Sequence, residues 1–441
     1  MPSANTSRVR WFLVFWLFVL SAVSYLDRVN FSIAGGAIVD AYRLTQVQLG
    51  EVISAMLAGY ALFQTAGGRL ADRFGPRRVL TFGVLWWGIF TGLTALVPAN
   101  IRGAFYAFVA VRFLLGAGEA VIYPGANQFI ARWIPFRERG IANGWIFAGV
   151  GAGAGLTPPL ITYFMLHHGW RSSFWVCAII GFLAAAVWFV AARDTPAEHR
   201  RVSPSELAEI QSGVSPDRAG QSASSGRAAL LPWRKVVRSK EVLALTVSYF
   251  CYGYVAWIFF SWFYIYLSRV RGLNLKASAL YSMLPFIAMS LSCLVGGAIN
   301  DRLTRLYSPR LGRCGLAIVG LVIASIFIAC GAYVQSARLA SVILAGGAGA
   351  VYLSQSSFWS VTVDIGGASS GSISGFMNMG NQIGAAITAS LTPWIAARYG
   401  WTASFLVAAG LCVVGALSWL VIDPVRTLET TTAAEPQEVR S

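Results

Sequence analysis

The sequence has little charge, and least of all acidic charge. Only 12% of its 441 residues are charged, and 18 Asp and Glu stand against 34 Lys and Arg. A soluble domain has about 25% charged residues. Because 56% of the residues are hydrophobic, the composition excludes an ordinary soluble protein and indicates a polytopic membrane protein. We therefore attribute the net charge of +16 to loops on one side of a membrane and not to nucleic acid binding.

Side chains that bind metals or act as nucleophiles are also scarce. The three His residues include an adjacent pair, His167 and His168, where a surface loop is expected, and the six Cys residues lie in separate apolar runs without C-x-x-C spacing. The sequence thus predicts no metal site and no cofactor. An integral membrane enzyme needs a cluster of His, Asp or nucleophilic residues at one membrane face. We find no such cluster and do not expect an enzyme.

Long apolar runs, in contrast, are abundant. A helix needs about 20 apolar residues to cross a bilayer, and we count six such runs before a polar interruption and six after it. The first run continues into Asp27 and Arg28 without a small-residue cleavage site, so we interpret it as a retained helix and not as a signal peptide. The runs begin near Trp11, Gly50, Val79, Gly103, Gly140, Ser172, Val242, Ala277, Cys314, Arg338, Ser370 and Trp401.

This pattern predicts an all-α membrane protein of twelve transmembrane helices in two six-helix bundles. Residues 1–10 form an N-terminal tail, 11–192 the first bundle, 193–240 a linker with a short surface helix near 205–211, 241–423 the second bundle and 424–441 a disordered tail. An even number of spans places both termini on one side. Most Lys and Arg residues fall in the loops of that side, so we assign it to the cytoplasm. We expect a monomer in the plasma (inner) membrane.

Internal repeats relate the two halves. RGIANG at 139–144 matches SGSISG at 370–375, and GWRSSF from Gly169 matches GWTASF from Gly400, in both cases 231 residues later. The helices that follow the first pair carry glycines at small-residue spacing, which predicts tight helix contacts. These glycines are Gly149, Gly151, Gly153, Gly155, Gly380 and Gly384.

A basic loop, GGRLADRFGPRR at 67–78, has a weaker copy, GGAINDR, at 296–302. Gly68 lets one helix approach another, Asp72 can face the positive end of a helix dipole, and the Arg side chains stay in water. The copy lacks the Gly that follows two residues after the Arg. We predict a gating loop and its counterpart from Gly68, Asp72, Arg73, Gly75, Arg77, Arg78, Asp301 and Arg302.

Four ionisable groups lie within the apolar runs: Asp27, Arg28, Arg112 and Glu119. Such groups cost several kcal/mol in a bilayer and need a partner or a water-filled path. One interpretation is two ion pairs that brace the first bundle. The other, which we favour, is a cavity for an anion and a proton, because Arg binds a carboxylate bidentately and a desolvated carboxyl group can hold a proton.

Neutral polar residues in the same runs are further candidates. Tyr25 and Tyr60 are either packing aromatics or hydrogen-bond donors to a substrate. In the second half, SQSSFW at 354–359 and NMGNQ at 378–382 place amides and hydroxyls inside apolar runs. They either bond neighbouring helices or bind a polyhydroxylated substrate. We select Gln355, Trp359 and Asn378 as substrate-binding candidates.

The spacing G-x-x-x-D-R-x-G-x-R-R of the basic loop resembles the loop between helices 2 and 3 of the major facilitator superfamily. SYLDRVNFSIA at 24–34, RFLLGAGEAVIYPG at 112–125 and the run ERGIANG look like the anion:cation symporter family within it. Members carry organic anions such as hexuronates, aldonates, glucarate, tartrate and phthalate, many of them with protons. The resemblance implies that Arg28 binds the substrate carboxylate, that Asp27 and Glu119 carry protons, and that Arg112 interacts with Glu119.

The predicted function is therefore proton-coupled import of an organic anion, foremost a sugar acid such as a hexonate, hexuronate or glucarate, by alternating access. Transport of another carboxylate such as tartrate or phthalate, export and Na⁺ coupling stay open. A sensor that binds the anion without moving it belongs to a different class, and it would usually need a longer signalling extension. The expected partners are the anion, the proton and the lipid bilayer.

Overall fold

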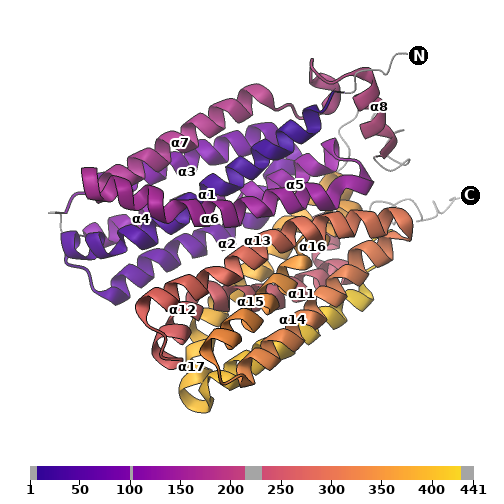
Figure 1. Ribbon diagram of the computed structural model, residues 1–441. Helices are drawn as coiled ribbons and strands as arrows, with labels where there is room; N and C mark the ends of the chain where they lie inside the picture. Colours follow the sequence, from indigo (N-terminus) through magenta and orange to yellow (C-terminus); the bar gives the residue numbers. More distant parts are fainter. Residues whose placement is uncertain (1–6, 100–102, 214–230, 429–441) are drawn as a thin grey trace, which may run out of the picture.

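Two helical bundles lie side by side in the protein (Figure 1). The structure is a computed structural model that describes residues 7–99, 103–213 and 231–428. Within these ranges the chain contains no β-strand. The predicted N-terminal tail up to residue 6, the middle of the linker at 214–230 and the tail from residue 429 lie outside the described residues.

In the described residues the first bundle holds seven helices, because the span predicted to begin near Gly103 consists of two helices. A capping box between Thr45 and Gln48 starts the second helix, and Gly75 at φ 88° turns the chain into the third, which opens on Pro76. The bundle comprises α1 (Val9–Tyr42), α2 (Gln46–Phe74), α3 (Pro76–Leu96), α4 (Ala104–Glu119), α5 (Ile122–Trp133), α6 (Arg139–His168) and α7 (Trp170–Ala191), with a 3₁₀ turn, η1 (Phe136–Glu138), before α6.

The second bundle repeats this plan with more irregular connections. Its longest helix, α17 (Ser370–Ser418), bends at Gly400, where φ is 83°, and so forms two rods. The other elements are α11 (Lys240–Ser261), α12 (Phe263–Ile265), π-helix η3 (Tyr266–Val270), α13 (Leu275–Leu306), π-helix η4 (Arg310–Gly315), α14 (Leu316–Tyr333), α15 (Ala337–Leu353), α16 (Gln355–Gly366), η5 (Gly367–Ser369) and η6 (Trp419–Val421).

The two halves use the same packing pattern. In the first, α1 packs on α6, α2 on α4 and α3 on α7; in the second, α11 packs on α17, α13 on α15 and α14 on α17. Between the bundles, α6 packs on α13, and α2 packs on α17. The predicted arrangement of two pseudo-symmetric helical bundles is thereby confirmed.

Several helix contacts depend on the predicted glycines. A Cβ at Gly153 on α6 would overlap the carbonyl oxygen of Ala22 on α1, and one at Gly384 on α17 would overlap that of Phe250 on α11. Tight contacts are therefore confirmed at equivalent places in both halves. The prediction is wrong for Gly155, where a Cβ would meet nothing within 4 Å, because this residue faces away from the neighbouring helices.

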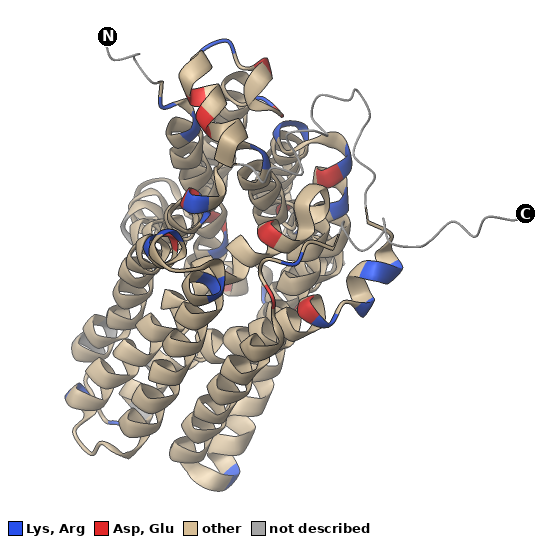
Figure 2. Ribbon diagram, turned by 90° about the vertical axis from the view of Figure 1, so that its right-hand side faces the viewer, with Lys and Arg blue, Asp and Glu red and all other residues tan. Residues whose placement is uncertain are grey.

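The outer surface suits a lipid environment. Large apolar side chains are exposed on it, among them Leu166 and Val190. Within the described ranges, nine helical stretches are long and apolar enough to cross a membrane. One of them runs from Ala337 to Val421, and α2 is not included, so the predicted number of twelve spans stays a prediction. Figure 2 shows the charged positions crowded toward the end of the bundles that carries the linker helices; we call it the linker end.

Part of the linker docks on the first bundle. Helix α8 (Pro204–Gly213) confirms the predicted linker helix, although Glu206 in it is fully buried. The Glu206 carboxylate accepts hydrogen bonds from the backbone N–H groups of Val9 (3.2 Å) and Arg10 (3.0 Å) and so caps α1. Arg10 also pairs with Glu209 at 2.6 Å, and this hydrogen bond lowers the pKa of the exposed Glu209 carboxyl.

Beyond the undescribed part, the linker touches both bundles. Leu231 is buried, its carbonyl oxygen accepts from Arg69 Nη1 on α2 (2.8 Å), and its N–H donates to Ser369 Oγ (2.9 Å). Helix α10 (Trp233–Arg238) then leads into α11. The linker therefore joins α2 to the turn between α16 and α17 at the linker end.

Candidate functional site

A cavity lies between the two bundles. Its wall comes from α1, α2, α5 and α6 on one side and from α11, α15, α16 and α17 on the other. It contains all six predicted substrate-binding residues, whose role in binding stays a prediction. The polar lining residues are Arg28, Gln355, Asn378, Asn381 and Gln382, and the others are Tyr25, Tyr60, Tyr123, Phe147, Val150, Tyr249, Tyr252, Ala256, Trp257, Phe260, Tyr352 and Trp359.

Arg28 is held in this wall by one carboxylate and two aromatic rings. Its Nε donates to Glu119 Oε2 at 3.1 Å, and Glu119 at the end of α4 is fully buried. The guanidinium carbon lies 4.3 Å from the ring centre of Tyr60 and 5.0 Å from that of Tyr25, which precedes it by almost one turn of α1. In the described chain, Arg28 Nη2 and Glu119 Oε1 have no hydrogen-bond partner. The pair thus keeps one donor and one acceptor for other groups.

Asp27 points away from this cavity, as expected for the neighbour of Arg28 on a helix. It is 2% exposed, does not line the cavity, and its Oδ2 accepts from Thr91 Oγ1 on α3 at 2.9 Å. Its Oδ1 has no hydrogen-bond partner among the described residues. The two carboxylates that we predicted to carry protons therefore lie in different surroundings, one beside the cavity and one inside the first bundle.

The charge of Arg112 interacts with that of Glu119, as the resemblance implies, but the two side chains form no ion pair among the described residues. Among the ion pairs of the described residues, Glu119 pairs with Arg28 instead. Arg112 lies over the ring of Phe31 at 4.3 Å and donates to Met56 Sδ at 3.3 Å. Seven residues on one helix correspond to a rise of about 10 Å, so the shared face does not bring the two side chains into contact.

The opposite wall presents neutral hydrogen-bonding groups. The hydroxyl of Tyr249 on α11 accepts from Gln355 Nε2 and from Trp359 Nε1 on α16, both at 3.0 Å. On α17, Asn381 Nδ2 lies 3.4 Å from Asn378 Oδ1. The described residues of the second bundle therefore contribute amides, indoles and phenols, but no charge, to the lining of the cavity.

Sequence reasoning identified six of the 17 lining residues and missed the other 11. Tyr249 and Tyr252 are not among the predicted binding residues, and NMGNQ supplies only one of them although Asn381 and Gln382 also line the cavity. The helical spacing of 378, 381 and 382 could have identified them, because positions three and four apart share a face. Tyr123 and Tyr352 gave no such signal, since isolated tyrosines are common in membrane helices.

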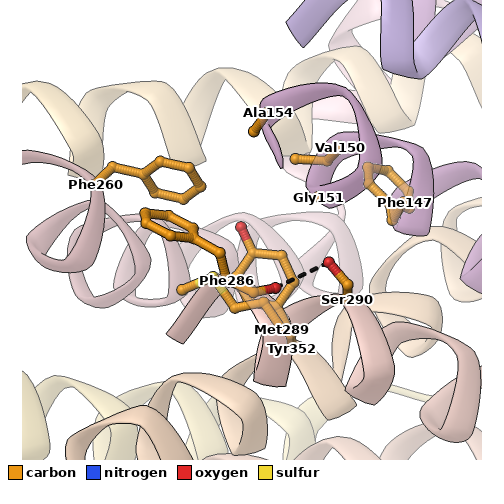
Figure 3. A pocket seen from close by; sticks show the side chains of 9 residues that line it. All are labelled: Phe147, Val150, Gly151, Ala154, Phe260, Phe286, Met289, Ser290 and Tyr352. Atoms are coloured by element: carbon orange, nitrogen blue, oxygen red, sulfur yellow. Dashed lines mark hydrogen bonds between the residues drawn. The ribbon is translucent and has the colours of Figure 1, made fainter. Parts of the chain in front are cut away.

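A smaller apolar pocket adjoins the cavity (Figure 3). The two share Phe147, Val150, Phe260 and Tyr352. In Figure 3 the rings of Phe260 and Phe286 lie next to each other; their planes are tilted by 57° and their centres are 4.8 Å apart. The hydroxyl of Ser290 is already bonded to the Phe286 carbonyl oxygen at 2.9 Å. The pocket extends the apolar part of the lining between α6 and α13.

At the linker end, Asp72 joins the bundles as the predicted helix-dipole partner. Its carboxylate accepts from the backbone N–H groups of Gly371 (2.9 Å) and Ser372 (2.8 Å), which open α17. Gly68, one turn earlier, lies so close to α17 that a Cβ would overlap the carbonyl oxygen of Gly371. Asp72 therefore caps a helix of the opposite bundle at its positive end.

Asp301 makes the equivalent contact despite the missing glycine in its loop. It accepts from the backbone N–H groups of Gly140 (2.8 Å) and Ile141 (2.7 Å) at the start of α6. Arg313, which is fully buried, pairs with Asp301 and with Asp364, both at 3.0 Å. Asp364 is buried and also pairs with Arg139 at 2.6 Å.

The other residues of the predicted gating loop lie outside these contacts. Arg73, Arg78 and Arg302 are exposed, as expected for Arg residues in water. The N–H of Arg77 donates to Asp194 Oδ1 at 2.9 Å, and a Cβ at Gly75 would overlap this carboxylate. These residues shape the turn between α2 and α3, while Asp72 and Gly68 form its contact with the other bundle.

The comparisons with known proteins agree with this architecture. A family model described as "Major Facilitator Superfamily" matches residues 17–389 and 365–440. The chain belongs to this superfamily. Proteins of this superfamily are membrane transporters, so the prediction that the chain is not an enzyme is confirmed.

Relatives and a solved structure extend the comparison. The "Probable sulfoacetate transporter SauU" of Cupriavidus necator is 33% identical over 410 residues, which are 92% of each chain. The "Hexuronate transporter" of Bacillus subtilis is 26% identical over 411 residues, 92% of this chain and 93% of that one. The proton:xylose symporter XylE has the same fold, with a TM-score of 0.71 over 96% of this chain and 98% of that one, at 15% identity. The superfamily fold and the multi-pass membrane character are thus established.

Proposed function

We propose that this protein is a secondary transporter of small organic anions, and that it couples the import of a sugar acid to protons. One observation carries the proposal: Arg28, paired with Glu119, lines a cavity between the bundles and faces neutral amides across it. The names of the relatives, which include transporters of hexuronate and sulfoacetate, support transport of an organic anion. We place the protein in the plasma membrane with both termini in the cytoplasm.

Arg28 would bind the anion. Its Nη2 has no partner in the described chain, and a guanidinium group binds a carboxylate through two parallel hydrogen bonds. Gln355, Asn378 and Gln382 would hold hydroxyl groups from the opposite wall. Because these residues belong to different bundles, a bound anion joins the two halves.

Glu119 would couple the anion to the proton. Its carboxylate competes with the substrate for the same guanidinium group, since it pairs with Arg28 at 3.1 Å. Protonation of Glu119 would remove this competing negative charge and leave Arg28 to the substrate. Asp27, which lies outside the cavity, would hold a second proton without touching the substrate.

The bundles would then rock to open the linker end. In this structure Asp72 and Asp301 each cap a helix of the opposite bundle, so the linker end is closed. Opening would require both caps to separate. This arrangement is the one that alternating access about a pseudo-two-fold axis requires.

Uptake into proteoliposomes tests the proposal. We would impose an inward proton gradient without sodium and offer galactonate, gluconate, glucuronate, glucarate, tartrate and phthalate. We expect gradient-driven accumulation of at least one sugar acid, and only background uptake by Arg28→Ala. Accumulation that is indifferent to the proton gradient would contradict proton coupling. If folded protein accumulated no acid of this panel, the proposed function would be wrong.

A further inference from the structure

Among the described residues, the cavity is lined by a single charged side chain. This is the cation Arg28, and the described lining includes no Asp, Glu or Lys. Across the cavity, Gln355, Asn378 and Gln382 are neutral. Arg112, the other Arg within the apolar runs, is not a lining residue and contacts Phe31 and Met56.

Arg28 itself has room for one anionic group. Its guanidinium carbon lies over the rings of Tyr25 and Tyr60, and its Nε donates to Glu119. Its Nη2 atom is buried and has no hydrogen-bond partner among the described residues, so one carboxylate on this edge would satisfy it. A second carboxylate at the other end of the substrate would meet only amides and aromatic rings. An unpaired ionised carboxylate in such surroundings is strongly disfavoured and takes up a proton instead.

We infer that the cavity accepts anions with one negative charge, so that a dicarboxylic acid enters only with one of its two carboxyl groups protonated. The inference rests on the proposed function and narrows it. Monocarboxylates such as aldonates are carried as they occur at neutral pH. The corresponding aldarates compete through the small fraction that is singly protonated.

Matched pairs of sugar acids test the inference. Galactonate and galactarate share one carbon skeleton and differ only at C6, which is a hydroxymethyl group in one and a carboxylate in the other; gluconate and glucarate form a second pair. We would measure how strongly each acid displaces its labelled aldonate at pH 7, 6 and 5. At each pH we would compare the affinity for the aldarate with that for its aldonate. A change in the protonation of the protein affects both acids and so cancels in this ratio.

At pH 7 we expect each aldarate to bind at least about tenfold more weakly than its aldonate. The singly protonated fraction of an aldarate grows about tenfold for each unit that the pH falls toward the pKa of its carboxyl groups. The aldarate's affinity relative to that of its aldonate should therefore rise by about the same factor per pH unit. Equal binding at pH 7, or a ratio that does not change between pH 7 and pH 5, would overturn the inference. If none of the four acids binds to folded protein, the inference is overturned, and the uptake panel with glucuronate then decides separately whether the proposed function stands.

A charge-gain variant gives an independent readout. Asn378→Lys places a second cation opposite Arg28, at a residue whose hydrogen bond to Asn381 is long at 3.4 Å. We expect it to bind galactarate at least about tenfold better relative to galactonate and to abolish the pH dependence of the ratio. Asn378→Met, similar in size but neutral, should retain the discrimination. A folded Lys variant that discriminates like the unmodified protein would contradict the inference.

Discussion

At the scale of single residues, Arg28 depends on its shape as well as on its charge. The planar guanidinium fits between Tyr25 and Tyr60 and reaches Glu119 with one edge. Lys keeps the charge but has neither the planar fork nor the stacking geometry. We predict that Arg28→Lys lowers the initial rate of sugar-acid uptake by at least about tenfold. Arg43→Lys, at an exposed position, serves as the control, and uptake by Arg28→Lys at the unmodified rate would contradict the prediction.

The position of Asp27 separates its predicted role from substrate binding. It is buried within the first bundle, bonded to Thr91 and absent from the cavity wall. We predict that Asp27→Asn, which keeps the acceptor for Thr91, abolishes accumulation driven by a proton gradient. Exchange of labelled for unlabelled substrate across the membrane, which needs no net proton movement, should persist. Loss of both activities in folded protein would place Asp27 in substrate binding and contradict this separation.

Charged residues show where residue-level prediction works and where it stops. Asp27, Arg28, Arg112 and Glu119 stood out because a charge within an apolar run is costly and therefore rare. Arg313 did not stand out, since it follows a loop and a charge next to a loop is expected in water. Yet it is fully buried and pairs with Asp301 and Asp364. Its partners come from other helices, and their approach is a property of the folded structure.

At the scale of elements, the start of each helix was largely predictable. The largest difference between the predicted and the observed starts falls on α2, predicted near Gly50 and observed at Gln46. The capping box of Thr45 explains it, because a cap starts a helix ahead of its apolar run. The break between α4 and α5 and the π-helices η3 and η4 were not predicted. Hydropathy measures only composition, so it does not distinguish a π-helix or a short break from a continuous α-helix.

The contact between α2 and α17 leads to a prediction for Gly68. A methyl group there would overlap the carbonyl oxygen of Gly371, so α2 and α17 would have to separate. We predict that Gly68→Ala lowers uptake several-fold and makes the linker end more accessible to a water-soluble thiol reagent. Gly50→Ala on the same helix is the matched control, because a Cβ there meets nothing within 4 Å. Equal behaviour of the two variants would contradict a close contact at Gly68.

At the scale of the whole molecule, the repeats predicted two related halves but not how the halves meet. The matching segments at 139–144 and 370–375 proved to be the helix starts that Asp301 and Asp72 cap. The repeats predicted that these helix starts are equivalent. They did not predict that each is capped from the opposite bundle, because that contact forms only when the bundles assemble.

These two caps are related by the pseudo-two-fold axis and close the same interface, so neither alone should control its opening. Asp72→Asn and Asp301→Asn each weaken one set of charge-assisted hydrogen bonds.

Thr362 on α16 is a suitable reporter, because it is fully buried and bonded to Asn127 of the first bundle at 2.7 Å. In a variant without the six native cysteines, we predict that Thr362→Cys reacts slowly with a membrane-impermeant thiol reagent added from the linker side. Each single Asn substitution should raise this rate modestly, and the double substitution should raise it at least about tenfold. Thr157→Cys, buried within the first bundle, should stay unreactive in all four backgrounds. A double variant that reacts no faster than either single one would show that one cap alone sets the opening, and the symmetric account of closure would then be wrong.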